Sequence, residues 1–123
     1  METGLTYTST VTVSEDNIAV TMGSGDLEVF ATPAMVALME NAAMNAVVGE
    51  LPEGATTVGA MMNTTHIKPS AMGDTVSATA VLKEVEGRKL TFEVQAKDSK
   101  GVIGEGTHVR YIVDREKFMS KLA

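Results

Sequence analysis

The alternation of hydrophobic and polar residues predicts a chain made mostly of β-strands, with one long helix among them. Stretches that are rich in Thr and Val, or that alternate with period two, are typical of strands, and clusters of Gly, Pro, Asp and Ser indicate turns. The predicted strands cover residues 5–13, 56–67, 75–86, 90–96 and 102–113, with a loose segment at 23–26 and a short helix at 116–122. No repeat or linker interrupts this pattern, so we expect a single domain over residues 1–123.

The clearest element is a helix predicted from Pro33 to Val48. Thr32 suits the N-cap position, because its hydroxyl can accept a hydrogen bond from a free backbone N–H group. Pro33 fits the first helical position, where its missing N–H group costs nothing, and Gly49 is expected to end the helix.

This helix is apolar almost all round, since Glu40, Asn41 and Asn45 are its only polar residues. Such a helix is expected to be buried on most sides, unlike a surface helix with one polar half. Long strands beside one buried helix favour an α+β structure in which an antiparallel sheet wraps around the helix, the architecture of a hotdog fold. The sheet edges and the remaining apolar helix surface also predict a homodimer, with a tetramer left open.

Composition narrows the function classes. The net charge is −6, and residues 1–67 contain no Lys or Arg, whereas residues 68–123 contain all ten bases. Aromatic residues are scarce and no basic patch is concentrated, so nucleic acid is not an expected partner. No apolar run is long enough to cross a bilayer and no signal-peptide pattern is present, so we expect a cytoplasmic protein. The chain has no cysteine and two distant histidines, so no metal site and no cofactor are expected.

Glu40 and His66 are the strongest candidates for chemistry. A carboxylate in a buried helix needs a hydrogen-bond partner or must give up its charge. Two interpretations of Glu40 are therefore open: it makes a structural contact, or it acts as a base beside a substrate cavity. An isolated histidine in a strand is often a hydrogen-bonded core residue, but a carboxylate and an imidazole that face one cavity suit general acid–base catalysis. We expect His66 to point toward the helix, on the same strand face as Val58, Ala60, Met62 and Thr64.

Thr32 also carries a possible chemical role. A hydroxyl beside free N–H groups at the positive end of a helix can hold a carbonyl or a developing oxyanion. Thr32 and Glu40 are eight residues apart, which is about 12 Å along a helix. Either a substrate spans the two residues, or the site combines two subunits.

His108 and Arg110 are weaker candidates, taken here as substrate-binding residues. His108 alternates with Gly104, Gly106 and Arg110, and glycines inside a strand often mark the close approach of another backbone or a ligand. A structural role for His108 is an equally good interpretation, and Arg110 could pair with an acid or a phosphate.

Residues Val29 to Phe118 closely resemble the family of hotdog-fold acyl-CoA thioesterases that includes fluoroacetyl-CoA thioesterase. The resemblance is carried by VFATPAMVALMENAA, VGAMMNTTHIKPSAMGDTV, LKEVEGRKLTFEVQAKD and GVIGEGTHVRYIVDREKF. It implies a homodimer that hydrolyses acyl-CoA thioesters without a metal, with CoA itself part of the substrate. It also implies that Thr32, Glu40 and His66 are catalytic and that the backbone of Gly59 lies against the reacting group. The residue that forms any covalent intermediate is left open.

One segment departs from the family pattern. NIAVTMGSGDLE, before the helix, contains no aromatic residue, whereas the fluoroacetyl-specific member has an aromatic lid there. We therefore expect a different or broader acyl range. The alternatives are a hotdog enoyl-CoA hydratase or dehydratase, which pairs an Asp and a His close in sequence, and a non-catalytic acyl-CoA-binding domain.

Overall fold

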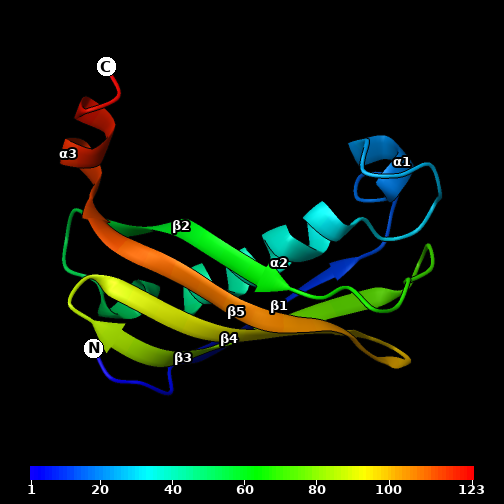
Figure 1. Ribbon diagram of the computed structural model, residues 1–123, viewed down its shortest axis with the longest axis horizontal. Coiled ribbons are helices and arrows are strands. Elements are labelled where there is room, and N and C mark those ends of the chain that lie inside the picture. Colours follow the sequence, from blue (N-terminus) through cyan, green and yellow to red (C-terminus); the bar gives the residue numbers. More distant parts are fainter.

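One antiparallel sheet curls around the long helix α2 in the computed structural model, which describes residues 1–123 (Figure 1). The strand order is β1-β3-β4-β5-β2, and every neighbouring pair is antiparallel. The predicted sheet around a single long helix is confirmed. The elements are β1 (Thr6–Thr12), α1 (Ala19–Met22), α2 (Thr32–Val47), the 3-10 turn η1 (Val48–Glu50), β2 (Ala55–Thr64), β3 (Thr75–Glu86), β4 (Lys89–Asp98), β5 (Gly101–Asp114) and α3 (Arg115–Ser120).

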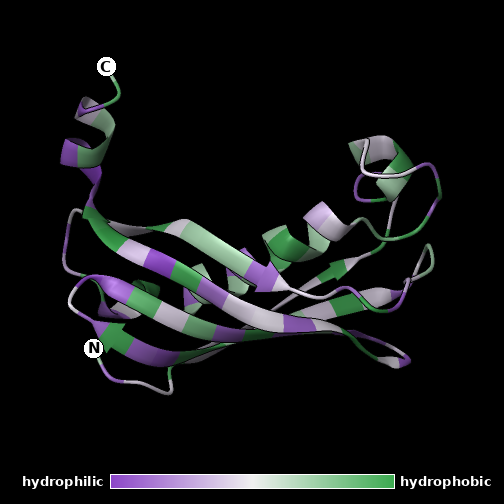
Figure 2. Cartoon of the chain, viewed as in Figure 1, coloured by the Kyte–Doolittle hydropathy of each residue, from purple (hydrophilic) through white to green (hydrophobic).

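The core lies between one face of the sheet and one side of α2. Side chains on β3 and β4 alternate between buried and exposed, as the period-two pattern predicts, and Figure 2 shows the matching alternation of hydropathy along the strands. Small alanines on β3 leave room for the helix to lie close to the sheet. The fully buried residues include Val76, Ala78, Ala80 and Leu82 on β3, Leu90, Phe92 and Ala96 on β4, and Met35, Met39, Ala42, Ala43 and Val47 on α2.

The start of α2 corrects one prediction. Ala31 is the N-cap residue, no side chain caps the helix, and Thr32 is already its first residue. The prediction of Thr32 as the N-cap is therefore wrong. Ala31 has the extended backbone conformation of an N-cap residue. The Thr32 hydroxyl is therefore not needed as a cap, and it bonds to a side chain outside the helix.

Burial of α2 is one-sided in the single chain. The residues that face the sheet are inaccessible, whereas Ala37, Asn41 and Met44 are exposed on the opposite side. The expected burial on most sides is thus not reached within one chain. An exposed helix side with two apolar residues fits the predicted pairing of two chains.

Strand β2 contains a bulge that the sequence pattern did not reveal. Gly59 pairs with Arg110 and Met61 pairs with Val109, so Ala60 has no partner. The extra residue shifts the alternation by one, so Thr57 and Gly59 before it share the helix-facing side with Met62, Thr64 and His66 after it. The prediction that Val58 and Ala60 share the face of His66 is therefore wrong.

The predicted close approach at two glycines of β5 is confirmed. A β-carbon on Gly106 would collide with the carbonyl oxygen of Asn63 and lie 2.6 Å from the α-carbon of Thr64. A β-carbon on Gly104 would collide with the carbonyl oxygen of Thr65. Backbone atoms give way poorly, so only glycine lets β5 approach the end of β2 this closely.

We predict that Gly106→Ala lowers the free energy of unfolding by about 1–3 kcal/mol, the usual cost of overpacking. The matched control is Gly49→Ala, because a β-carbon there meets nothing within 4 Å and the backbone is not in the left-handed region. Urea denaturation of the two variants would measure the difference. Equal stability of both variants would contradict the close approach.

Candidate active site

Thr32 and His66 form one half of the candidate site. Thr32 begins α2, and His66 follows the end of β2, where the backbone continues beside β5. The Thr32 Oγ1 atom lies 2.7 Å from His66 Nδ1, so the prediction that His66 points toward the helix is confirmed. The hydroxyl can donate its hydrogen to a neutral ring or accept one from it, which makes the pair suitable for proton transfer.

The other ring nitrogen of His66 is buried and has no hydrogen-bond partner. Burial lowers the pKa of His66, and a backbone contact at Lys68 offsets this only in part. The ring is therefore neutral at pH 7. A buried ring nitrogen without a partner is rare, because the uncompensated burial of a polar atom costs free energy.

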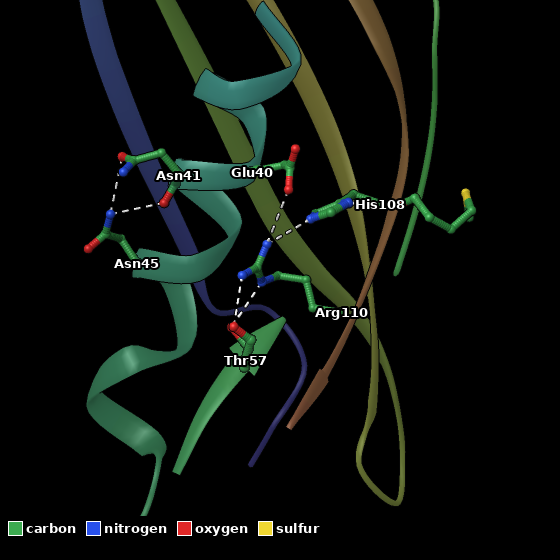
Figure 3. Close-up of polar contacts among 7 residues, drawn as sticks. Glu40, Asn41, Asn45, Thr57, His108 and Arg110 are labelled. Atoms are coloured by element: carbon green, nitrogen blue, oxygen red, sulfur yellow. Dashed lines mark hydrogen bonds and ion pairs between the residues drawn. The ribbon is translucent and has the colours of Figure 1, made fainter. Parts of the chain in front are cut away.

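Glu40 in the middle of α2, Gly59 on β2, and His108 and Arg110 on β5 form the other half. Figure 3 shows Glu40, His108 and Arg110. The Glu40 Oε2 atom lies 3.8 Å from Arg110 NH1, and the Glu40 side chain is 41% exposed. A β-carbon on Gly59 would lie 2.8 Å from this carboxylate oxygen, so glycine leaves the room that Glu40 occupies. The expected partner of the helix carboxylate is thus the guanidinium of Arg110.

Arg110 is 6% exposed, and its charge is balanced by several acceptors. Its Nε atom donates to Thr57 Oγ1 at 2.9 Å, and NH2 donates to the Thr57 carbonyl oxygen at 3.0 Å. Burial lowers the pKa of Arg110, and the nearby Glu40 raises it. Sequence reasoning missed Thr57, because the bulge that turns it inward has no recognisable pattern.

The two asparagines of α2 have a separate structural role. The Ser9 hydroxyl on β1 donates to Asn41 Oδ1 at 2.7 Å, and Asn45 Nδ2 donates to the Asn41 carbonyl oxygen at 2.9 Å. The contacts between the two asparagines lie beside the Glu40 cluster in Figure 3, and no hydrogen bond joins either asparagine to that cluster. Of Glu40, Asn41 and Asn45, only Glu40 belongs to the candidate site.

Two shallow hollows meet at Glu40. One, of about 230 Å³, is lined by Glu40, Gly59, Ala60, Met61, Met62 and His108. The other, of about 310 Å³, is lined by Ala37, Glu40, Asn41, Met44 and Arg110. A larger hollow of about 540 Å³ lies over the outward-facing side chains of β3, β4 and β5, and contains none of the predicted site residues.

The two halves of the site are separate within one chain. No hydrogen bond or ion pair joins the Thr32–His66 pair to the Glu40 cluster. Eight residues of helix separate Thr32 from Glu40, which corresponds to about 12 Å. The structure also contains no group of three or more His, Cys, Asp or Glu residues placed to hold a metal ion. None of its helices is long and apolar enough to span a bilayer.

Comparison with known proteins identifies the class of this chain. Residues 13–116 match the family model of fluoroacetyl-CoA-specific thioesterase. Fluoroacetyl-CoA thioesterase from Streptantibioticus cattleyicolor is 43% identical over 95 residues, which cover 77% of this chain and 68% of that protein. A crystal structure of fluoroacetyl-CoA thioesterase superposes with a TM-score of 0.92 at 35% identity, covering 99% of this chain and 95% of that one.

A hot-dog-like protein from Thermanaerovibrio acidaminovorans also superposes, with a TM-score of 0.90 at 26% identity, covering 99% of this chain and 90% of that one. The fold is therefore the predicted hotdog fold, and the protein is a thioester hydrolase of that fold. More narrowly, the chain belongs to the fluoroacetyl-CoA-specific thioesterase family, as the sequence resemblance indicated.

We predict that the free energy of unfolding decreases as the pH falls below 6.5. Burial lowers the pKa values of His66 and His108 below 6.5, so the unfolded chain binds more protons than the folded chain in that range. Well above pH 6.5 both states are neutral at these two residues, and the contribution is complete. Urea denaturation between pH 5 and 8 measures this dependence, and His66→Asn should make it shallower. A stability that rises on acidification toward pH 5 would contradict the prediction.

Proposed function

We propose that this protein hydrolyses acyl-CoA thioesters to the free acid and CoA, with Glu40, His66 and Thr32 as its catalytic residues and no metal or other cofactor. The main support is the chemistry available at the two halves of the site. Glu40 is a carboxylate that is open to solvent on one side and is held beside Gly59, and His66 is a neutral imidazole bonded to a hydroxyl. Both are groups that can act as general acid or base in thioester hydrolysis.

The proposed reaction transfers one proton away from the nucleophile and one proton to the CoA sulfur. An oxygen nucleophile bonds to the thioester carbon while a base takes its proton, and the carbonyl electrons move to the carbonyl oxygen. Collapse of this intermediate restores the carbonyl and breaks the C–S bond, and the CoA sulfur receives the proton. The nucleophile is water in direct hydrolysis. In the alternative it is a side chain, which forms an ester if it is a hydroxyl or an anhydride if it is a carboxylate, and water then cleaves this acyl intermediate. Thr32 positions the carbonyl or attacks it in this scheme.

Gly59, His108 and Arg110 are proposed to serve substrate binding. Gly59 presents backbone to the reacting group, because no side chain stands between it and Glu40. Arg110 supplies a positive charge next to Glu40, and His108, which is 1% exposed, forms part of the wall of the smaller hollow and contacts Arg110.

The acyl group is proposed to differ from fluoroacetate or to vary more widely. Residues 17–28 contain no aromatic side chain, and Val20, Met22 and Leu27 of this segment are exposed. An open hollow of about 350 Å³ lies between this segment, β1 and α2. Flexible aliphatic side chains adapt to more shapes than a rigid ring does.

We propose that the active enzyme is a cytoplasmic homodimer in which each site combines two chains. The argument is the distance of about 12 Å between Thr32 and Glu40 in one chain, together with the exposed helix side that carries Ala37 and Met44. Two chains that pair through this side would bring the Thr32–His66 pair of one chain toward Glu40 of the other.

We predict that Glu40→Gln and His66→Ala each lower kcat for thioester hydrolysis by about 10²–10⁴, the usual contribution of acid–base groups. A thiol-release assay against short, medium, long and aromatic acyl-CoA esters would measure this. The matched control is Glu50→Gln, which changes an exposed carboxylate in the 3-10 turn η1 after α2 and should retain activity. Losses below tenfold would overturn the catalytic assignment. Binding of CoA esters without turnover by the unmodified protein would instead favour a binding domain.

Mixed dimers would test the two-chain site. His66→Ala and Glu40→Gln chains carrying different tags can be co-expressed and purified through both tags. If each site combines two chains, one of the two sites in a mixed dimer has both residues intact, and about half the wild-type rate returns. If both residues act within one chain, every site keeps one defect and the mixed dimer stays as inactive as its parents.

A further inference from the structure

His108 lies where β5 meets the bulge of β2 and the middle of α2. Its side chain is 1% exposed, and Phe92 on β4 lies against it with the ring centroids 6.2 Å apart. Nδ1 lies 2.7 Å from the Met61 carbonyl oxygen, and Nε2 lies 3.2 Å from Arg110 NH1. Both ring nitrogens are therefore engaged, and neither is free for a substrate.

These two partners determine where the hydrogen of the ring lies. A guanidinium group can only donate, so His108 Nε2 must offer a lone pair to Arg110. A carbonyl oxygen can only accept, so His108 Nδ1 must carry the hydrogen that Met61 receives. A single neutral tautomer, with hydrogen on Nδ1, satisfies both contacts.

Arg110 is held on its other side by Thr57, through Nε and NH2. The remaining nitrogen, NH1, lies between His108 Nε2 at 3.2 Å and Glu40 Oε2 at 3.8 Å. Figure 3 shows His108 and Glu40 on the same side of the guanidinium group, with Thr57 on the opposite side. The contact from His108 thus fixes the one nitrogen that faces the carboxylate.

We propose that His108 is a positioning residue, which as a neutral ring aims NH1 of Arg110 at Glu40 and ties the bulge carbonyl of Met61 to β5. The Glu40 carboxylate is then held in a fixed position relative to the backbone of Gly59. This inference rests on the proposed catalytic role of Glu40. In this inference His108 orients Arg110 and does not bind the substrate through its ring nitrogens.

The surroundings of the ring favour its neutral form. Burial lowers the pKa of His108, the hydrogen bond to Met61 opposes this effect, the charge of Arg110 lowers the pKa further, and Glu40 raises it. Arg110 on β5 and Glu40 on α2 are the charged groups that face the ring, while β2 and β4 present the Met61 carbonyl and the ring of Phe92. Protonation would set an N–H group against the N–H group of Arg110, so acid should displace the guanidinium from Glu40.

Two conservative variants separate the two contacts of the ring. In His108→Asn the amide nitrogen can replace Nδ1 toward Met61, but nothing reaches Arg110. In His108→Gln the side-chain oxygen can reach the place of Nε2 and accept from Arg110. We expect kcat to fall about ten- to a hundredfold in the Asn variant with KM nearly unchanged, and to recover largely in the Gln variant, since small misplacements of a catalytic group have effects of this size.

Packing provides the control. Phe92→Leu removes contact with the ring without changing its hydrogen bonds, so it should lower stability and leave kcat close to wild type. Loss of kcat in this variant equal to that of His108→Asn, or no better activity in His108→Gln than in His108→Asn, would overturn the positioning role.

A double-mutant cycle tests the route of the effect. If His108 acts through Arg110, then His108→Asn adds almost no further loss in an Arg110→Gln background. Losses that multiply would show that His108 acts independently and would overturn the inference.

A measurement without substrate distinguishes failure of this inference from failure of the proposed function. The ¹⁵N spectrum of the His108 ring at pH 7 should show the neutral form with hydrogen on Nδ1. Hydrogen on Nε2, or a doubly protonated ring, would overturn the inference whether or not the protein turns over a thioester. Absence of turnover with the expected ring spectrum would contradict only the catalytic function.

Discussion

The packing of α2 against the sheet is the constraint on which the rest of the structure depends. A helix with so few polar residues is stable in water only when another element covers its apolar side. Met35 and Met39 supply that side, and Ala78 and Ala80 on β3 allow the close contact. Once the helix is packed in this way, Thr32 lies at its beginning and Glu40 in its middle, about two helical turns apart.

The bulge in β2 decides which side chains face this helix. In a regular strand Gly59 and Met62 would point to opposite faces, because side chains alternate with period two. The unpaired Ala60 brings both to the helix side. The bulge therefore places the glycine beside Glu40 without displacing the pair of Thr32 and His66 further along.

A buried guanidinium group explains the polar network between these elements. Burying a charge is costly unless acceptors and an opposite charge surround it. Thr57 provides two acceptors, His108 a third, and Glu40 the negative charge for Arg110. The same contacts hold Thr57, His108 and Arg110 in place beside the carboxylate of Glu40, so the need to satisfy one buried charge also orders the site.

Local pattern was enough to predict much of this protein. The bounds of the strands other than β2 lie within two residues of the prediction, because alternation and turn residues act over short distances. Glu40 stood out as the only charge in an apolar helix, and the glycines around His108 pointed to close contact.

Two features could not be read from that pattern. The bulge at Ala60 and the inward turn of Thr57 depend on pairing with β5, which is distant in sequence. The N-cap of α2 differs from the prediction for the same kind of reason. The Thr32 hydroxyl bonds to His66, which is distant in sequence, and does not bond to a nearby backbone N–H group. The sequence by itself determined the helices and strands, and it determined which side chains are capable of catalytic chemistry. Only the tertiary structure decided which of them meet, because contacts between distant strands depend on the register and on the packing of the whole sheet.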